Sequence, residues 1–377
     1  MKQTSIFKNF FKNEKSGGIV LIFVTLLSLL LANSPFKIIY SGFWEQSLAG
    51  LKLEHWINDG LMSVFFLLIG LEIKRELIEG ELSSLKKASL PVISALGGML
   101  VPALLYVSFN FNSTTSNGFG IPMATDIAFA LGVLSLIGNR VPTALKVFLA
   151  ALAIIDDLGA IIIIALFYSS TISFVYLGLA LLIFILLLVL NKLKINSLLF
   201  YIIGGIGMWY FMNLSGVHAT ITGFLVALTI PLRSNEKHSP ANILQKKLHF
   251  PVPFIILPLF AMANTAIELT SNWQSNLFEN YSIGIFFGLL IGKPIGITLF
   301  TWLAVKSKIS HLPSGVKWSH IIGASCLGGI GFTMSIFVTL LAFKDVSMIQ
   351  SAKLIILISS ISSGLIGFFW LKIALKK

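Results

Sequence analysis

Two adjacent aspartates, Asp156 and Asp157, lie in the middle of an apolar run that is long enough to cross a membrane. No other charged residue occurs between Val147 and Tyr168. A carboxylate at the bilayer centre costs about 2.5–3.5 kcal/mol on insertion scales, so a membrane protein keeps such groups for a task. Apolar residues on both sides disfavour the alternative of a helix cap or an interfacial loop. The pair is therefore expected to hold a cation, a proton, or each in turn.

The two carboxylates are expected to do different work. Neighbouring positions on a helix are about 100° apart, so both side chains cannot share one face. We expect Asp157 to bind the cation, and Asp156 to pair with Lys293 or to exchange a proton. Lys293 lies near the middle of another apolar run, where a lysine needs a partner or a task. Carboxylate oxygens together with a hydroxyl such as that of Thr125 suit a hard cation, Na⁺ or Li⁺.

The composition places these residues in a polytopic, all-α membrane protein. The 377-residue chain is 56% hydrophobic and only 11% charged, whereas a soluble domain has about 25% charged residues. Apolar runs of about 20 residues predict twelve spans. Their approximate limits are 17–33, 57–77, 88–109, 121–138, 145–168, 172–191, 197–213, 217–232, 249–267, 282–305, 318–343 and 350–372.

The basic residues follow the positive-inside rule. With the N-terminus in the cytoplasm, 22 of the 27 Lys and Arg fall on the cytoplasmic side and 4 on the outer side. This asymmetry predicts that both termini are cytoplasmic. It also accounts for the net charge of +12 without a nucleic-acid partner.

Two of the expected spans carry helix-breaking residues. Span 121–138 contains Pro122 and the polar pair Thr125 and Asp126, and span 318–343 contains a run of glycines around position 330. Glycine and proline loosen a helix, and polar groups at that depth cannot face lipid. We therefore expect two discontinuous helices. Asp126 would offset the positive N-termini of the half-helices and Lys293 the negative C-termini, and for both residues a purely structural role is the alternative.

Each broken span is the second in a trio of spans, which cover about 88–168 and 282–372. Three spans are an odd number, so the second trio is inverted relative to the first. This arrangement predicts a transporter built from inverted repeats with a midplane site. We expect one transmembrane transporter domain over 1–377, in which the remaining helices, about 17–77 and 217–267, form an interface panel.

Titratable residues also occur near span ends. Glu72, Glu76 and Glu79 share a helical face with Arg75 beside them. They form either a solvated cytoplasmic helix end or a charge cluster at a cytoplasmic entrance. His218 is either a packing histidine or a group that titrates near neutral pH.

These residues together resemble the NhaA family of bacterial sodium/proton antiporters, whose members are built from inverted repeats. The resemblance covers almost the whole chain. The matching stretches are 56–62 through Glu76, 124–132, 153–160, 216–220, 257–264, Gly292-Lys293-Pro294 and 329–335.

The resemblance implies roles for individual residues. Asp156 and Asp157 match the cation and proton site, and Lys293 matches a lysine that pairs with the first aspartate. Thr125 and Asp126 match the crossing of the broken helices, and both are expected to take part in cation or proton binding with the aspartate pair. A further implied set contributes to pH sensing at a cytoplasmic funnel: Glu72, Arg75 and Glu76.

Two stretches depart from the family pattern. Gln245 and Lys246 stand where well-studied members have an acid and a titratable histidine of the pH-sensing region. These two positions and His218 complete the pH-sensing candidates. The outside loop, Ala32 to Trp56, is short compared with members whose β-hairpin there holds a homodimer together.

The expected function is electrogenic Na⁺(Li⁺)/H⁺ antiport by alternating access in the bacterial inner membrane, pH-regulated, for cytoplasmic pH and sodium homeostasis. The transported ions are Na⁺, Li⁺ and H⁺, and no cofactor is expected. Another Na⁺-coupled carrier would need a roomier polar pocket, and a passive channel fits poorly with buried Lys293. An intramembrane aspartyl protease, the enzymatic alternative, needs aspartates from separate helices.

Overall fold

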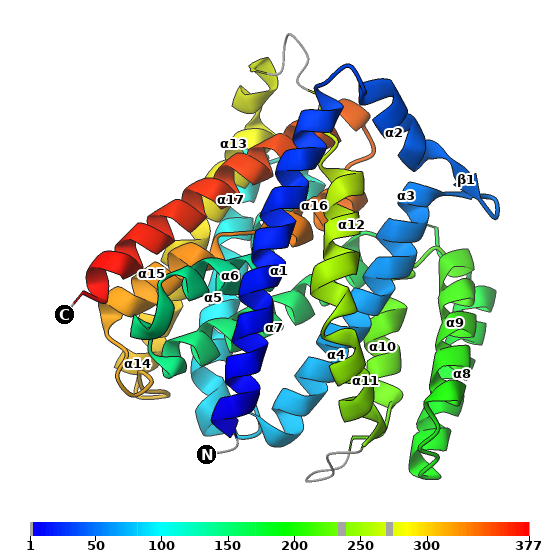
Figure 1. The fold of residues 1–377 in the computed structure, drawn as a ribbon, viewed down its shortest axis with the longest axis horizontal. Coiled ribbons are helices and arrows are strands. Elements are labelled where there is room, and N and C mark those ends of the chain that lie inside the picture. The colour runs from blue at the N-terminus through cyan, green and yellow to red at the C-terminus, as the bar shows by residue number, and fades with distance from the viewer. Residues whose placement is uncertain (1–2, 81, 170, 233–238, 269–273, 377) are drawn as a thin grey trace. The chain divides into compact units, whose positions relative to one another are not determined.

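The computed structural model describes residues 3–80, 82–169, 171–232, 239–268 and 274–376. The described chain is mostly helical, which confirms the predicted all-α membrane class (Figure 1). The only strands among the described residues are β1 (Ser47–Leu48) and β2 (Leu51–Lys52), which pair antiparallel. The chain divides into two compact units. Unit 1 comprises Met1–Tyr40, Ser84–Ala160 and Asn264–Lys377, and unit 2 comprises Ser41–Ser83 and Ile161–Ala263.

Unit 1 carries the two aspartates. Its elements are α1 (Gln3–Ala32), the start of α2 (Lys37–Glu45), α5 (Leu85–Phe109), the 3₁₀ segments Ser116–Met123, Gly138–Arg140 and Ser275–Phe278, α6 (Ile127–Leu136), most of α7 (Thr143–Phe167), α13 (Asn280–Phe287), the π-helical turn Gly288–Gly292, α14 (Lys293–Lys306), α15 (Trp318–Gly328), α16 (Phe332–Ala342) and α17 (Val346–Ala374).

Helices α5 and α14 pack closely through two glycines. A Cβ at Gly97 would collide with the carbonyl oxygen of Gly296, and a Cβ at Gly296 would collide with that of Gly97. Beside this contact the hydroxyls of Ser94 and Thr301 lie 2.6 Å apart. Small residues let helix backbones approach each other in membranes, where no hydrophobic effect drives them together. This contact fixes the start of α14, and with it Lys293.

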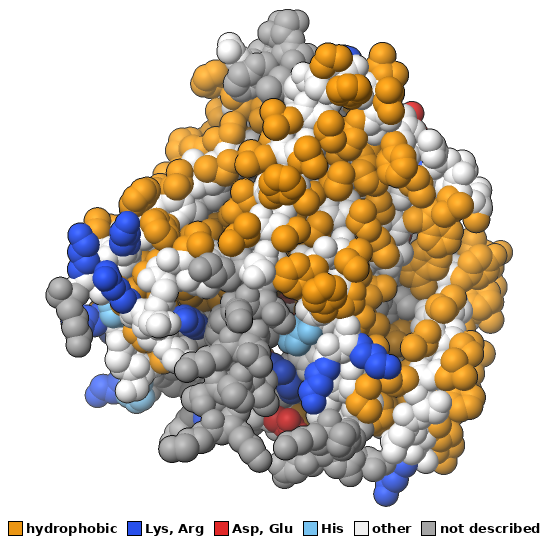
Figure 2. Space-filling model, in the orientation of Figure 1, with side chains coloured by type: hydrophobic (Ala, Val, Ile, Leu, Met, Phe, Trp, Pro, Cys, Tyr) orange, Lys and Arg blue, Asp and Glu red, His pale blue; other side chains and the backbone are white. Residues whose placement is uncertain are grey.

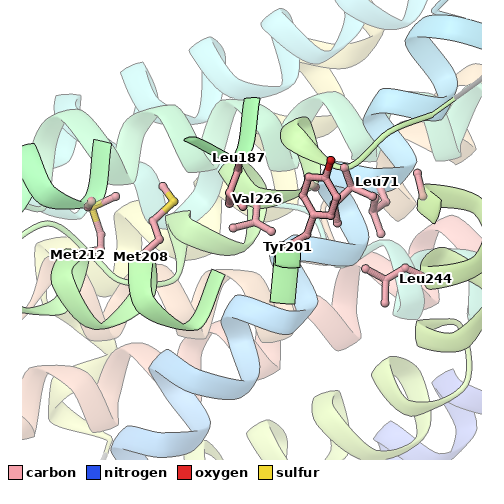
Figure 3. Packing of buried hydrophobic residues seen from close by; sticks show 11 residues of the cluster. Leu71, Leu187, Tyr201, Met208, Met212, Val226 and Leu244 are labelled. Atoms are coloured by element: carbon pink, nitrogen blue, oxygen red, sulfur yellow. The ribbon is translucent and has the colours of Figure 1, made fainter. Parts of the chain in front are cut away.

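Unit 2 consists of α3 (Leu53–His55), the π-helical segments Trp56–Leu61 and Val252–Ile256, α4 (Met62–Glu79), α8 (Phe174–Lys192), α9 (Leu198–Ser215), α10 (Ile221–Thr229), α11 (Pro240–Leu248) and α12 (Leu257–Asn264), together with β1 and β2. One cluster of its buried apolar side chains is built from α4, α8, α9, α10 and α11, and Figure 3 shows seven members of it: Leu71, Leu187, Tyr201, Met208, Met212, Val226 and Leu244. Gly223 brings α10 against α4, where a Cβ would collide with the carbonyl oxygen of Ser63.

The predicted count of twelve spans is not confirmed. Eight described helices are long and apolar enough to span a membrane, or up to ten if each of two bent helix pairs forms one span. Two expected spans are not among these helices. Helix α10 has only nine residues, and α4 carries charged side chains over its last two turns. The connection 231–248 between two expected spans contains α11, and its residues 233–238 lie outside the described part.

Candidate functional site

Two helix breaks meet inside unit 1. Residues 124–126 are extended between the 3₁₀ segment Ser116–Met123 and α6. The second break separates α15 from α16, whose axes differ by 44°. The backbone N–H of Asp126 in the first break donates to the carbonyl oxygen of Ile330 in the second, over 2.7 Å. The two discontinuous helices that the sequence predicted are thus present, and they cross at their breaks.

Asp126 stabilises the N-terminal ends of both half-helices at this crossing. Its Oδ1 accepts a hydrogen bond from the Phe129 N–H at 2.9 Å, which caps α6. Its Oδ2 accepts from the Thr333 N–H at 3.1 Å and from the Thr333 hydroxyl at 2.5 Å, in the first turn of α16. The carboxylate is 2% exposed. An anion in this position compensates the partial positive charge of two helix N-termini.

Asp156 forms a fully buried ion pair. The Lys293 Nζ lies 2.8 Å from Asp156 Oδ2, and neither side chain is exposed to solvent. Lys293 reaches this position because it opens α14, directly after the π-helical turn Gly288–Gly292. Among the described residues, the other oxygen, Asp156 Oδ1, is buried and has no hydrogen-bond partner. Removing one member of a buried pair leaves an uncompensated charge, so the two residues depend on each other.

Thr125 connects this ion pair to the crossing. Its hydroxyl lies 2.8 Å from Asp156 Oδ2 and 2.9 Å from the carbonyl oxygen of Gly328, and Lys293 Nζ donates to it. A hydroxyl has one proton, so it donates to only one of the two acceptors at a time. Gly328 is the last residue of α15. Thr125 therefore links the ion pair to the C-terminal end of a half-helix.

Asp157 follows on α7 and is 1% exposed. It lies within electrostatic range of Lys293, but the closer partner of the lysine is Asp156. The structure thus gathers five of the predicted site residues within unit 1: Thr125, Asp126, Asp156, Asp157 and Lys293. The side-chain oxygen atoms of Thr125 and the three aspartates are the kind that a hard monovalent cation binds.

A second group of predicted residues meets at the C-terminal end of α4 in unit 2. Glu72 is 8% exposed and faces Gln245, which is 4% exposed. Arg75 lies within electrostatic range of Glu72 and places a guanidinium nitrogen 3.3 Å from Glu76 Oε1. Lys246 follows Gln245 on α11 but is exposed. A solvated helix end, the alternative reading, fits the exposed Glu79 and the partly exposed Glu76 better than the buried Glu72.

His218 lies elsewhere in unit 2. Its Nε2 is 2.7 Å from the carbonyl oxygen of Tyr168, to which it donates. It also lies within electrostatic range of Asp59, which belongs to the π-helical segment before α4. Glu72 is on the C-terminal half of α4, so His218 and the Glu72 group lie near opposite ends of that helix. The structure does not bring them together.

The sequence analysis gave no role to several residues that the structure brings to these groups. His249, the residue after α11, lies within electrostatic range of Arg75. The Lys74 Nζ donates to the carbonyl oxygens of Leu228 and Ile230, at 2.7 and 2.6 Å, and holds the end of α10. No sequence pattern predicts such contacts with backbone carbonyls, because every residue has one.

Known proteins resemble this chain over its full length. It is 58% identical over 376 residues to the Na⁺/H⁺ antiporter NhaA of Flavobacterium psychrophilum, covering 100% of this chain and 98% of that one. It is 57% identical over 372 residues to the Na⁺/H⁺ antiporter NhaA 1 of Flavobacterium johnsoniae, covering 99% and 98%.

The fold also has a known counterpart. The structure of the sodium proton antiporter MjNhaP1 from Methanocaldococcus jannaschii matches with a TM-score of 0.53 at 15% identity, over 100% of this chain and 99% of that one. The profile of the family described as Na⁺/H⁺ antiporter 1 matches residues 8–371. This multi-pass membrane protein therefore belongs to the Na⁺/H⁺ antiporter 1 family.

Proposed function

We propose that this protein is an electrogenic, pH-regulated antiporter that exports Na⁺ or Li⁺ in exchange for H⁺ by alternating access. The observation that carries the proposal is the buried pair Asp156 and Asp157 beside the crossing of two broken helices, with Lys293 bound to Asp156. The names of its relatives support the same exchange. It would act in the bacterial inner membrane with both termini in the cytoplasm, as the distribution of basic residues supports.

Competition for the carboxylates is the basis of exchange. Asp157 is the main cation ligand, and Asp156 Oδ1 and the Thr125 hydroxyl are further oxygen ligands. Protons and Na⁺ bind to the same carboxylate oxygens, so they exclude each other. Adjacent carboxylates also bind protons as coupled sites. Low pH then empties the site of Na⁺, and a pH threshold follows from the pair itself. Glu72, Arg75 and their neighbours shift that threshold through the local electric field.

The moving parts are two inverted repeats, about 88–168 and 282–372. Each contains one broken helix in its middle, and the two breaks are joined by the hydrogen bond from Asp126 to Ile330. Lys293 and Asp126 act mainly by compensating charge at these breaks. The family resemblance predicts a homodimer held by a β-hairpin in the outside loop. Here the strands of that hairpin, β1 and β2, have only two residues each.

The variant Asp157→Asn tests the proposal, because it keeps the size of the side chain but removes the main charge that holds the cation. We expect no Na⁺-dependent proton movement in proteoliposomes and no Na⁺ binding by calorimetry. Asp345→Asn is the matched control, since Asp345 is an exposed helix cap and asparagine caps a helix about as well. Near-normal transport by purified Asp157→Asn would remove Asp157 from the site.

The wild-type protein separates the proposal from the alternatives. An antiporter accumulates Na⁺ against its gradient when a proton gradient is imposed, whereas a channel only dissipates the Na⁺ gradient. Electrogenic exchange also responds to an imposed membrane potential at zero pH difference. A potential that leaves the exchange rate unchanged would show that the exchange is electroneutral.

A further inference from the structure

Helix α2, in the outside connection after the first span, has three distinct faces. Tyr40 and Trp44 are one turn apart and buried, at 9% and 6% exposure. A polar face carries Lys37, Ser41 and Glu45, also one turn apart, with the exposed Ile38 (76%) at its edge beside Glu45. The third face is apolar and exposed, with Phe36, just before the helix, at 61%, Ile39 at 73% and Phe43 at 48%. Residues three and four apart share a helix face, so these form a continuous apolar stripe.

The turn before α2 is held by several side chains. The Asn33 amide donates to the carbonyl oxygens of Leu29 and Ile267, at 2.9 and 2.8 Å. The Tyr40 hydroxyl donates to the Ser28 hydroxyl at 2.9 Å, and Lys37 pairs with Glu268 at 3.3 Å. These contacts join α2 to α1 and to the segment after α12. The angle between α1 and α2 is therefore part of the fold.

That angle places α2 along the membrane surface. Helices α1 and α2 differ in direction by 113°, so α2 turns just past a right angle from α1, as Figure 1 shows. Transmembrane helices lie on average about 20° from the bilayer normal, so a helix that turns by 113° from one of them lies within about 45° of the membrane plane. Exposed apolar side chains also cover the C-terminal half of α1, where Phe23 is 65% and Leu30 is 70% exposed. Figure 2 shows how hydrophobic side chains dominate much of this face of the molecule. The apolar stripe of α2 continues this lipid-facing surface.

We infer that α2 is an interfacial helix whose stripe of Phe36, Ile39 and Phe43 inserts into the outer boundary between lipid headgroups and acyl chains. A helix of this kind has one apolar and one polar face and lies in the plane of the interface. The polar face with Lys37 and Glu45 then meets water. A second copy of the chain is a poorer occupant, because three side chains on nine residues are far from the ~800 Å² that each partner of a stable interface buries.

Spin labels on α2 test the inference, which depends on the membrane fold and not on the proposed transport. The chain has one cysteine, Cys326, so Cys326→Ser gives a background for Ile39→Cys on the apolar stripe and Ser41→Cys on the polar face. Phe43→Cys is a second position on the stripe. Each labelled protein is reconstituted in phospholipid vesicles, and its accessibility to oxygen, which concentrates in lipid, is compared with that to a water-soluble nickel chelate.

The inference predicts that labels at positions 39 and 43 meet oxygen several-fold more readily than nickel, and that the label at position 41 shows the reverse. Equal nickel accessibility at all three positions would place α2 in water and overturn the inference. Protection of positions 39 and 43 from both reagents, with dipolar broadening between labels, would assign the stripe to a second copy and would equally overturn it. Transport measured on the same vesicles reports separately on the proposed function.

Discussion

The ion pair between Lys293 and Asp156 predicts a stability loss that depends on pH. The variant Lys293→Met keeps most of the side-chain volume but leaves Asp156 buried without its cation. If Asp156 stays ionised, the uncompensated charge costs about 3–5 kcal/mol. If Asp156 binds a proton instead, protonating it costs about 4 kcal/mol at pH 7 and about 1.5 kcal/mol at pH 5, because the ordinary pKa of such a carboxyl group is about 3.9. The variant should therefore lose roughly 4 kcal/mol at pH 7 and clearly less at pH 5.

Chemical denaturation of the purified protein in detergent at both pH values measures these differences against the wild type. Two further variants separate charge from size. Lys293→Met combined with Asp156→Asn removes both charges and should recover most of the stability, with no pH dependence of the remaining loss. Lys293→Arg keeps the charge and should cost about 1–3 kcal/mol from overpacking at either pH. A loss in Lys293→Met that is equal at pH 5 and pH 7 would refute the reasoning.

Three other outcomes follow from the contacts described above. Thr333→Val removes the hydroxyl that donates to Asp126 but keeps the N–H, and should lower the stability by about 1.5–3 kcal/mol in the same denaturation assay. Gly97→Ala should disturb the packing of α5 on α14 and lower the thermal midpoint, whereas Gly178→Ala, with open space around it, should not. Gln245→Glu with Lys246→His should move the pH–activity midpoint in proteoliposomes at a largely unchanged maximal rate, and an overlaid pH profile would exclude both positions from regulation.

The sequence predicted the membrane class, the family and the breaks in two helices, because these leave strong local signals. Pro122 and the glycines near position 330 weaken helices wherever they occur. The number of spans was harder to predict. The predicted span 217–232 ends close to the end of α10, just before Pro231, but its first four residues lie outside that helix, and hydropathy does not reveal this late start. The predicted span 57–77 follows the helical run 56–79 closely, and only the charged end of α4 keeps this run from counting as a span on composition.

The contacts of the site were less predictable than its residue types. The positions of Asp156, Asp157 and Lys293 follow from charge at membrane depth. The second acceptor of Thr125, by contrast, is the backbone carbonyl of Gly328, 203 positions away. Likewise the hydrogen bond from Asp126 to Ile330 joins two backbones. Such bonds depend on the crossing geometry, which only tertiary structure supplies.

The hydrogen bonds to each carboxylate distinguish a structural aspartate from one with room for a cargo ion. Both oxygens of Asp126 accept hydrogen bonds from the half-helices α6 and α16, so fewer of its lone pairs are left for a cation. Asp156 uses Oδ2 for Lys293 and Thr125, while its Oδ1 accepts no hydrogen bond among the described residues. A buried oxygen without a donor is costly, and a cation or a proton would relieve that cost. Asp156 therefore has coordination capacity left and Asp126 has much less, although the two are equally buried.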